Sequence, residues 1–114
     1  MNTKHFEAIG RYQPGSATID LYGDLTVHAA EALDAAYTAL ASQNPGVIFF
    51  NFAGVDYLNS TGIALLISLV ARARQSSHTL MAYGLRPFHA ELFQLAGLHA
   101  YMPILSDENV IARP

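Results

Sequence analysis

The sequence predicts an α/β fold with a mixed, mostly parallel sheet of about four to five strands, an N-terminal hairpin and about four helices. Three observations lead to this prediction: the chain has 114 residues, 52% of them are hydrophobic, and strand and helix patterns alternate after two opening strands. Alternating strands and helices imply crossover connections and parallel strands. This length is typical of one domain, so we expect residues 1–114 to form a single domain.

Two segments at the start of the chain form the predicted hairpin. Residues 6–12 indicate a first strand, and residues 14–16, Pro-Gly-Ser, indicate a turn longer than the tightest hairpin loops. Residues 17–22 alternate, with Ile19 and Leu21 on one face and more polar side chains on the other. The Gly-Asp pair directly after them is expected to end this strand.

The middle of the chain alternates between helical and extended patterns. Thr26 can cap a helix over residues 29–41. Its apolar residues at core spacing are Leu33, Ala36, Tyr37 and Leu40. Residues 47–52 are an apolar run of β-forming residues and indicate a strand buried on both faces. After a turn, residues 60–75 indicate a second helix.

The last third of the chain continues the alternation. Residues 79–83 indicate a strand, and residues 87–96 indicate a third helix that starts at a proline and ends before Gly97. Residues 103–105 are expected to be extended. Ser106 can cap a last short helix with two acidic residues in its first turn.

The composition excludes several classes of function. The net charge is −3 and the six basic residues are scattered, so no basic stripe suits nucleic acid. The absence of cysteine excludes disulfides and thiolate metal sites. We expect a cytoplasmic protein without membrane insertion, because the N-terminus lacks a signal-peptide pattern and the longest apolar stretch, residues 63–71, is too short. Only 13% of the residues are charged, which favours a protein partner or a homodimer.

The sharpest local feature is the turn Asn59-Ser60-Thr61-Gly62, which opens an apolar helix after the buried strand. Ligands of open α/β sheets bind beyond the carboxyl ends of the strands, where this turn is expected. Asn59 or Ser60 can cap the helix, whose positive start would stabilise a phosphate on Ser60. Gly62 is expected to keep the site open because it has no side chain. The simpler interpretation is a helix cap with no further role.

No catalytic or metal-binding pattern accompanies this turn. Five histidines are scattered without metal-ligand spacing: His5, His28, His78, His89 and His99. A Gly-x-Ser-x-Gly motif and glycine-rich phosphate loops are absent. We therefore expect no enzymatic activity, no metal and no cofactor, with a small hydrolase that uses Ser60 as a minor alternative.

The order and spacing of several segments resemble a bacterial STAS domain of the anti-sigma-factor-antagonist type, at least from residue 17 to residue 112. The segments that resemble it are residues 21–25, 47–62 and 92–98. The family's turn reads Asp-Ser-Ser/Thr-Gly before an apolar helix. Ser60, Thr61 and Gly62 match this turn, and Asn59 stands where the family has aspartate.

The resemblance implies a regulatory protein that binds an anti-sigma factor with serine-kinase activity and thereby frees a sigma factor. Phosphorylation of Ser60 by this partner would end the binding, because phosphate adds about −1.5 to −2 charge to a neutral surface. Two differences, Asn59 and a family acidic position that falls on Thr26 beside Asp24, leave an alternative open. The alternative is a STAS domain that is not phosphorylated: a constitutive scaffold of a stress-sensing complex, or an accessory subunit of a lipid-trafficking ABC transporter.

The second helix offers an apolar strip next to Ser60. At about 100° per residue, the predicted core stripe is Ile63, Leu66, Ile67, Val70 and Ala73. Leu65 falls within the opposite face and Leu69 on its edge, beside the small residues Gly62, Ala64 and Ser68. This strip is interpreted as a partner contact, with simple tolerance of an exposed leucine as the alternative. The predicted partner-binding residues are Asp24, Thr26, Asn59, Ser60, Thr61, Gly62, Leu65 and Leu69.

Overall fold

The computed structural model describes residues 5–106 of the chain. Its strands and α-helices follow in the predicted order, with two short 3₁₀ helices, η1 and η2, between them. The elements are β1 (Glu7–Gln13), β2 (Ser16–Leu25), η1 (Val27–Ala29), α1 (Ala30–Ala41), β3 (Val47–Leu58), α2 (Ser60–Gln75), β4 (Thr79–Tyr83), α3 (Pro87–Leu95), η2 (Leu98–Ala100) and β5 (Ile104–Leu105). The short helix predicted after Ser106 lies outside the described residues.

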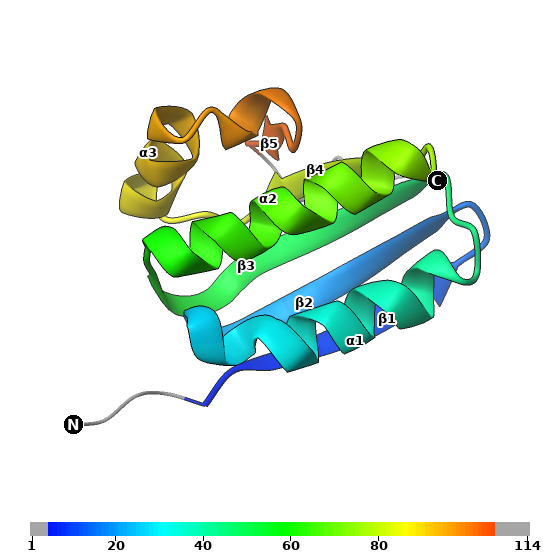
Figure 1. The fold of residues 1–114 in the computed structure, drawn as a ribbon, viewed down its shortest axis with the longest axis horizontal. Coiled ribbons are helices and arrows are strands. Elements are labelled where there is room, and N and C mark those ends of the chain that lie inside the picture. The colour runs from blue at the N-terminus through cyan, green and yellow to red at the C-terminus, as the bar shows by residue number, and fades with distance from the viewer. Residues whose placement is uncertain (1–4, 107–114) are drawn as a thin grey trace.

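All five strands form one sheet in the order β1-β2-β3-β4-β5. β1 and β2 are antiparallel, and the other neighbouring pairs are parallel. Figure 1 shows α1 and α2 lying across one face of the sheet, with α3 and η2 near β4 and β5. The predicted α/β fold class with its N-terminal hairpin is therefore confirmed. No helix within residues 5–106 is long and apolar enough to cross a membrane.

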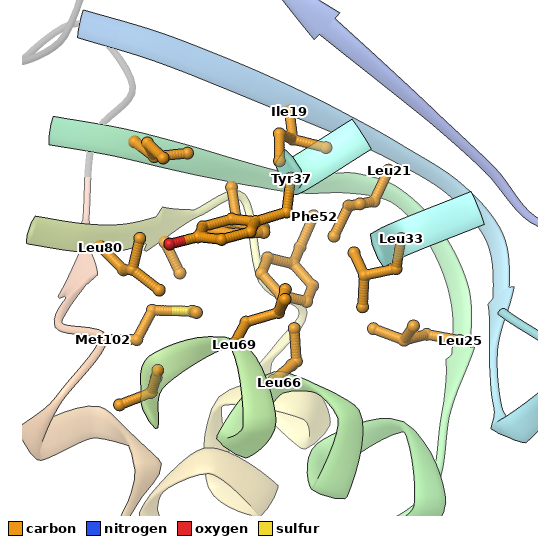
Figure 2. Close-up of a cluster of buried hydrophobic side chains, with 14 of the residues drawn as sticks. Ile19, Leu21, Leu25, Leu33, Tyr37, Phe52, Leu66, Leu69, Leu80 and Met102 are labelled. Carbon is orange, nitrogen blue, oxygen red and sulfur yellow. The ribbon is translucent and has the colours of Figure 1, made fainter. Parts of the chain in front are cut away.

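The core lies between the sheet and the helices α1 and α2. Figure 2 shows side chains from β2, β3, α1 and α2 that meet there: Ile19, Leu21, Leu33, Tyr37, Phe52, Leu66 and Leu69. Phe52 also meets Phe93 of α3 edge-to-face, with ring centroids 5.4 Å apart. Three of the predicted core positions of α1, namely Leu33, Tyr37 and Leu40, are buried.

The hairpin loop is shorter than predicted. β1 ends at Gln13, which pairs directly with Ser16 at the start of β2, so the loop consists of Pro14 and Gly15 alone. Gly15 has a φ of 87°, and proline followed by a residue with positive φ is the pattern of a type II turn. The prediction assigned Ser16 to the turn, whereas its backbone already pairs within the sheet.

Both central strands extend further than predicted. β2 continues to Leu25 and β3 to Leu58, so the strand ends predicted at residues 22 and 52 are wrong. The pairing between β2 and β3 shifts register twice, and Gly54 lies at the first shift. A Cβ on Gly54 would lie 2.4 Å from the Tyr22 ring. This glycine therefore permits a close approach in a bulged strand instead of ending it.

The far face of the sheet, which is the face opposite α1 and α2, carries a polar cluster. Arg11 of β1 donates from Nε to Asp20 Oδ2 at 2.6 Å and from Nη2 to Asp20 Oδ1 at 3.0 Å. Asn51 of β3 donates from Nδ2 to the same Oδ1 at 2.9 Å. Burial alone would raise the pKa of Asp20, but hydrogen bonds from Arg11 and Asn51 and the Arg11 charge outweigh it and lower that pKa. The cluster joins β1, β2 and β3 in one register.

The bounds of α2 match the prediction, but its buried stripe is rotated. Leu69 is buried and Leu65 is half-buried, whereas Ile67 is 46% exposed. The predictions of a buried Ile67, an outward Leu65 and a Leu69 at the edge of the outer face are therefore wrong. The cause is α1, which packs along the flank of α2 that carries Leu65. The period of a helical pattern does not tell which flank a neighbouring helix covers.

Candidate functional site

Asn59 alone connects β3 to α2. Its backbone is extended, and its side-chain Oδ1 accepts a hydrogen bond from the Gly62 N–H at 3.0 Å. The same Oδ1 accepts a bond from Thr61 Oγ1 at 2.8 Å, and the Asn59 carbonyl accepts one from the Ile63 N–H at 3.0 Å. Asn59 is therefore the N-cap, and these three bonds hold the first turn of α2.

Ser60 and Thr61 occupy the first two positions of α2, and both are exposed. Their backbone N–H groups have no partner within the helix, because they precede its first internal bond. The Thr61 hydroxyl bonds to Asn59. Within residues 5–106, no hydrogen bond involves the Ser60 hydroxyl. Ser60 thus presents an available hydroxyl at a helix end with partial positive charge.

Gly62 is buried, so the expectation that it keeps the site accessible is wrong. A Cβ at this position would lie 2.1 Å from the backbone oxygen of Leu25, the last residue of β2. Backbone atoms cannot move aside as the end of a flexible side chain can. The absence of a side chain therefore serves packing, because it lets the first turn of α2 touch the end of β2.

Thr26 and Asn59 lie near each other because each directly follows one of two residues that pair across neighbouring strands. Leu25 of β2 and Leu58 of β3 are partners in the parallel ladder, so the chain leaves both strands at the same level. Thr26 caps η1, with its Oγ1 accepting a bond from the His28 N–H at 3.3 Å. Two starts of helical structure, at η1 and at α2, therefore lie side by side at the carboxyl ends of the strands.

Two hollows flank α1 near this edge of the sheet. The first, of about 560 Å³, contains Asp24 and Thr26 in its lining. The second, of about 370 Å³, is a groove between α1 and α2 that contains Leu65 and Leu69. The predicted partner-binding residues thus fall into three adjoining places: the turn at residues 59–62, the first hollow and the groove.

Charged residues border both hollows. Arg72 of α2 forms an ion pair with Asp34 of α1 and donates to Thr38 Oγ1 at 2.9 Å, which ties the two helices together along the groove. The first hollow is lined by two histidines and two acidic residues among others. No group of three or more histidine and acidic side chains within residues 5–106 has a metal-binding arrangement.

Three exposed apolar side chains near the site were not predicted. Val27 is 57% exposed, Tyr57 51% and Ile67 46%. Val27 directly follows the predicted cap Thr26, and Tyr57 lies two residues before Asn59, so their closeness to the turn was a usable signal. Ile67 could not be found in this way, because its exposure depends on where α1 packs.

Comparisons with known proteins agree with this architecture. A family model described as "Mlab, STAS domain" matches residues 11–106. An anti-sigma-B factor antagonist of Staphylococcus aureus is 26% identical over 82 residues, which are 72% of this chain and 76% of that protein.

Solved structures of antagonists have the same fold. The structure of an anti-sigma factor antagonist from Mycobacterium paratuberculosis matches with a TM-score of 0.79 at 17% identity, over 92% of this chain and 89% of that chain. The Bacillus cell fate determinant SpoIIAA in its phosphorylated form matches with a TM-score of 0.69 at 23% identity, over 96% and 98%. The family match includes the whole site from Asp24 to Leu69. The chain therefore belongs to the STAS domain family, and within it resembles the anti-sigma factor antagonists.

Proposed function

We propose that this protein is a cytoplasmic partner-switching regulator. In its unphosphorylated form it binds an anti-sigma factor that is also a serine kinase, and phosphorylation of Ser60 ends the binding. The observation that carries the proposal is the exposed Ser60 hydroxyl at the first position of a 16-residue helix. The relatives that are named as antagonists, and the SpoIIAA structure described as phosphorylated, support it.

A phosphate on Ser60 would be stabilised where it forms. The unpaired N–H groups of Ser60 and Thr61 and the dipole of α2 favour an anion at this end. The phosphate adds about −1.5 to −2 charge beside exposed apolar side chains such as Tyr57. A partner that meets this surface with apolar or acidic groups would lose affinity through desolvation and repulsion.

The proposed contact surface consists of residues 59–62 and the two hollows beside them. Asp24 and Thr26 belong to the first hollow, and Leu65 and Leu69 belong to the groove. Leu69 is only 3% exposed, so Leu65 supplies more of the accessible apolar area. Ile67 extends this surface along the outer side of α2.

Asn59 favours a second candidate function. Its amide makes the capping bonds without the negative charge of the family's aspartate. A kinase that recognises this charge would not modify Ser60, and the domain would then be a constitutive scaffold or an accessory subunit of a lipid-trafficking ABC transporter.

Incubation with the kinase-type anti-sigma factor of the same genome and ATP distinguishes the two candidates. Mass spectrometry should find one phosphate on Ser60, and the phosphorylated protein should lose the partner in a pull-down. Ser60→Ala should keep the partner and remain unmodified. Ser68→Ala is the matched control, because Ser68 is an exposed serine of the same helix and its loss should leave phosphorylation unchanged. Tight binding without phosphate on Ser60 would support the scaffold, and no binding would contradict the proposal.

Ile67→Glu tests the extent of the contact surface. The change places a charge on an already exposed side chain, so the fold should survive while partner affinity falls by about tenfold or more, or about 1.4 kcal/mol. Leu95→Glu, at a position on α3 that is 80% exposed, should bind as the wild type does. Equal affinities for both variants would exclude Ile67 from the contact surface.

A further inference from the structure

β1 forms an open edge of the sheet. In the part of the chain that the structure describes, β1 pairs with β2 on one side and has no strand on its other side. Six of its seven residues are exposed. Figure 1 shows β1 at the side of the sheet away from β4 and β5. Such an edge offers its backbone groups to a further strand.

The hairpin register determines which backbone groups of β1 point outward. In a hairpin with a two-residue loop, the residues that flank the loop, here Gln13 and Ser16, form a hydrogen-bonded pair. Bonding then alternates along an antiparallel pair. The N–H and C=O groups of Ala8, Gly10 and Tyr12 are therefore the ones that face the open edge.

The side chains of β1 on the far face complement a second copy of themselves. Ile9 is 51% exposed, and Glu7 and Arg11 lie two residues before and after it on the same face. The carboxylate of Asp20 occupies Nε and Nη2 of Arg11 and holds the guanidinium in place. Arg11 also interacts with the Tyr83 side chain, yet its side chain stays 52% exposed. Because an arginine offers five N–H donors, its exposed part can bind a second carboxylate.

The helix above this edge leaves room for a second copy. α1 rests on β1 where Leu40 covers Gly10, since a Cβ on Gly10 would lie 3.0 Å from the Leu40 side chain. The flank of α1 that faces away from α2 carries only small side chains, namely Ala32, Ala36 and Ala39, at about 100° per residue. Ala32 lines the first hollow together with His5 and Phe6, the two residues directly before β1, which agrees with this flank lying on the side of β1.

We infer that β1 is the interface of a homodimer, in which the β1 strands of two copies pair antiparallel about a two-fold axis at Ile9. In this register Ile9 faces Ile9 of the second copy, and Glu7 faces its Arg11. Ala8 and Gly10 exchange backbone hydrogen bonds with Gly10 and Ala8 of the second copy. The result is a continuous ten-stranded sheet, with the two α1 helices in contact through their alanine flanks.

The opposite charges of Glu7 and Arg11 favour a second copy of this chain as the partner of β1, and they favour this register. Each Arg11 would lie between Asp20 of its own chain and Glu7 of the second copy. The two-fold axis would thus create two equivalent Arg11–Glu7 ion pairs across the interface. A shift by two residues would place Glu7 opposite Ile9 or Gln13 instead of Arg11. An interface of this kind is isologous and closed, so association stops at the dimer.

The inference does not depend on the proposed function. Ser60 follows β3, and β2 separates β3 from the dimer edge, so both copies of Ser60 stay accessible in the dimer. Only the first hollow borders the dimer contact, through Ala32. Failure of the phosphorylation experiment would leave the dimer untouched, and a monomeric protein would leave the phosphorylation proposal untouched.

Sedimentation velocity of the full chain over a range of concentrations tests the inference. The wild type should show a reversible dimer. Ile9→Lys should raise the dissociation constant by about tenfold or more, because like charges then meet across the axis. The lysine would face Asp20 within its own chain, so circular dichroism should show an intact fold.

Ile67→Lys is the matched control, because it makes the same substitution at a similar exposure, 46% against 51%. It should dimerise as the wild type does. A wild type that stays monomeric at the highest concentration would overturn the inference. A dimer that Ile9→Lys leaves unchanged, or that Ile67→Lys weakens equally, would overturn it as well.

Oxidation of Ile9→Cys tests the register. The chain contains no cysteine, so each copy would carry a single thiol. Directly opposed residues of a non-hydrogen-bonded pair have Cα atoms about 4.5 Å apart, and disulfides span about 4.4–6.8 Å. Ile9→Cys should therefore form a disulfide-linked dimer under mild oxidation, whereas Glu7→Cys and Ile67→Cys should not. Equal crosslinking of all three variants would contradict the register.

Discussion

The starts of η1 and α2 lie side by side, yet they are built differently. At α2, Asn59 accepts bonds from the Gly62 N–H and the Thr61 hydroxyl and is followed directly by 16 helical residues. At η1, Thr26 accepts one bond at 3.3 Å and is followed by a three-residue 3₁₀ helix before α1 begins. The dipole of α2 therefore acts at Ser60, whereas η1 separates Thr26 from the start of α1.

The difference indicates which hydroxyl of this edge suits a regulatory charge. The Thr26 oxygen already serves as a cap, and Asn59 performs that task for α2, so Ser60 is left available. Both starts depend on a shared contact, because the first turn of α2 rests on the backbone of Leu25, immediately before Thr26. Single substitutions can therefore measure three contributions separately: the contact of α2 with Leu25, the capping hydrogen bonds of Asn59 and Thr26, and the effect of a negative charge at the start of α2.

Gly62→Ala should have the largest effect on stability, because it disrupts the contact between both starts. Its Cβ would meet the Leu25 backbone oxygen at 2.1 Å. Alanine gains about 1 kcal/mol of helix propensity, but this overpacking should outweigh it and leave a net loss of about 2 kcal/mol or more. Urea denaturation measures the change. Gly46→Ala is the control, because its Cβ would lie at an ordinary 3.5 Å from its nearest neighbour, the Gly15 oxygen. Equal losses in both variants would show that the contact is unimportant.

Asn59→Ala should have the next largest effect. It removes the acceptor of two hydrogen bonds at the start of α2, so we expect the free energy of unfolding to fall by about 1.5 kcal/mol. Hydrogen exchange should accelerate at the amide of Gly62. If Asn59→Ala lowered the free energy of unfolding no more than Thr26→Ala does, the conclusion that Asn59 is the stronger cap would be wrong.

Asn59→Asp should stabilise the protein by about 0.5–1 kcal/mol, since a carboxylate suits the positive end of α2. The gain should be present at neutral pH. It should vanish as the pH falls below about 4, because a carboxylate stabilised in the folded state loses its contribution when it is protonated. Thermal unfolding at pH 7 and pH 3 measures both. A gain that persists in acid would contradict the electrostatic explanation.

Thr26→Ala should have the smallest effect, a loss of at most about 0.5 kcal/mol, because its single capping bond is long and exposed. Thermal unfolding beside wild type is sufficient to measure it. A loss as large as that of Asn59→Ala would make the two starts equivalent.

The sequence predicted the order of the elements and the cap of α2 because these depend on local chemistry. Strand and helix periodicity, the proline at the start of α3 and Gly97, whose φ is 74°, after its end are local signals. Asn59 was identified as a possible cap for the same reason, and Ser60 was correctly placed beside it.

The errors concern features that depend on distant parts of the chain. Gly62 was interpreted as an opening, and the strand that contains Gly54 was predicted to end before it. Both glycines are instead close contacts with β2, about 30 to 40 residues away in sequence. Leu65 was predicted to face outward and Ile67 to be buried, whereas Leu65 is half-buried and Ile67 is exposed, because α1 covers the flank of α2 that carries Leu65. A single sequence does not show which distant residues these side chains and glycines contact, so their roles can be read only from the structure.

The two-residue loop of the hairpin also has a consequence for the order of folding. Closing β1 onto β2 joins residues that are close in the chain, whereas the parallel pairing of β2 with β3 must wait for the connection through α1. We expect the hairpin to form first, within about 1–10 μs, and to act as the template on which Phe50 aligns. Substitutions in the hairpin should then slow refolding more than those in β5, which stopped-flow fluorescence through the tyrosines can measure. Equal rates would place the nucleus elsewhere.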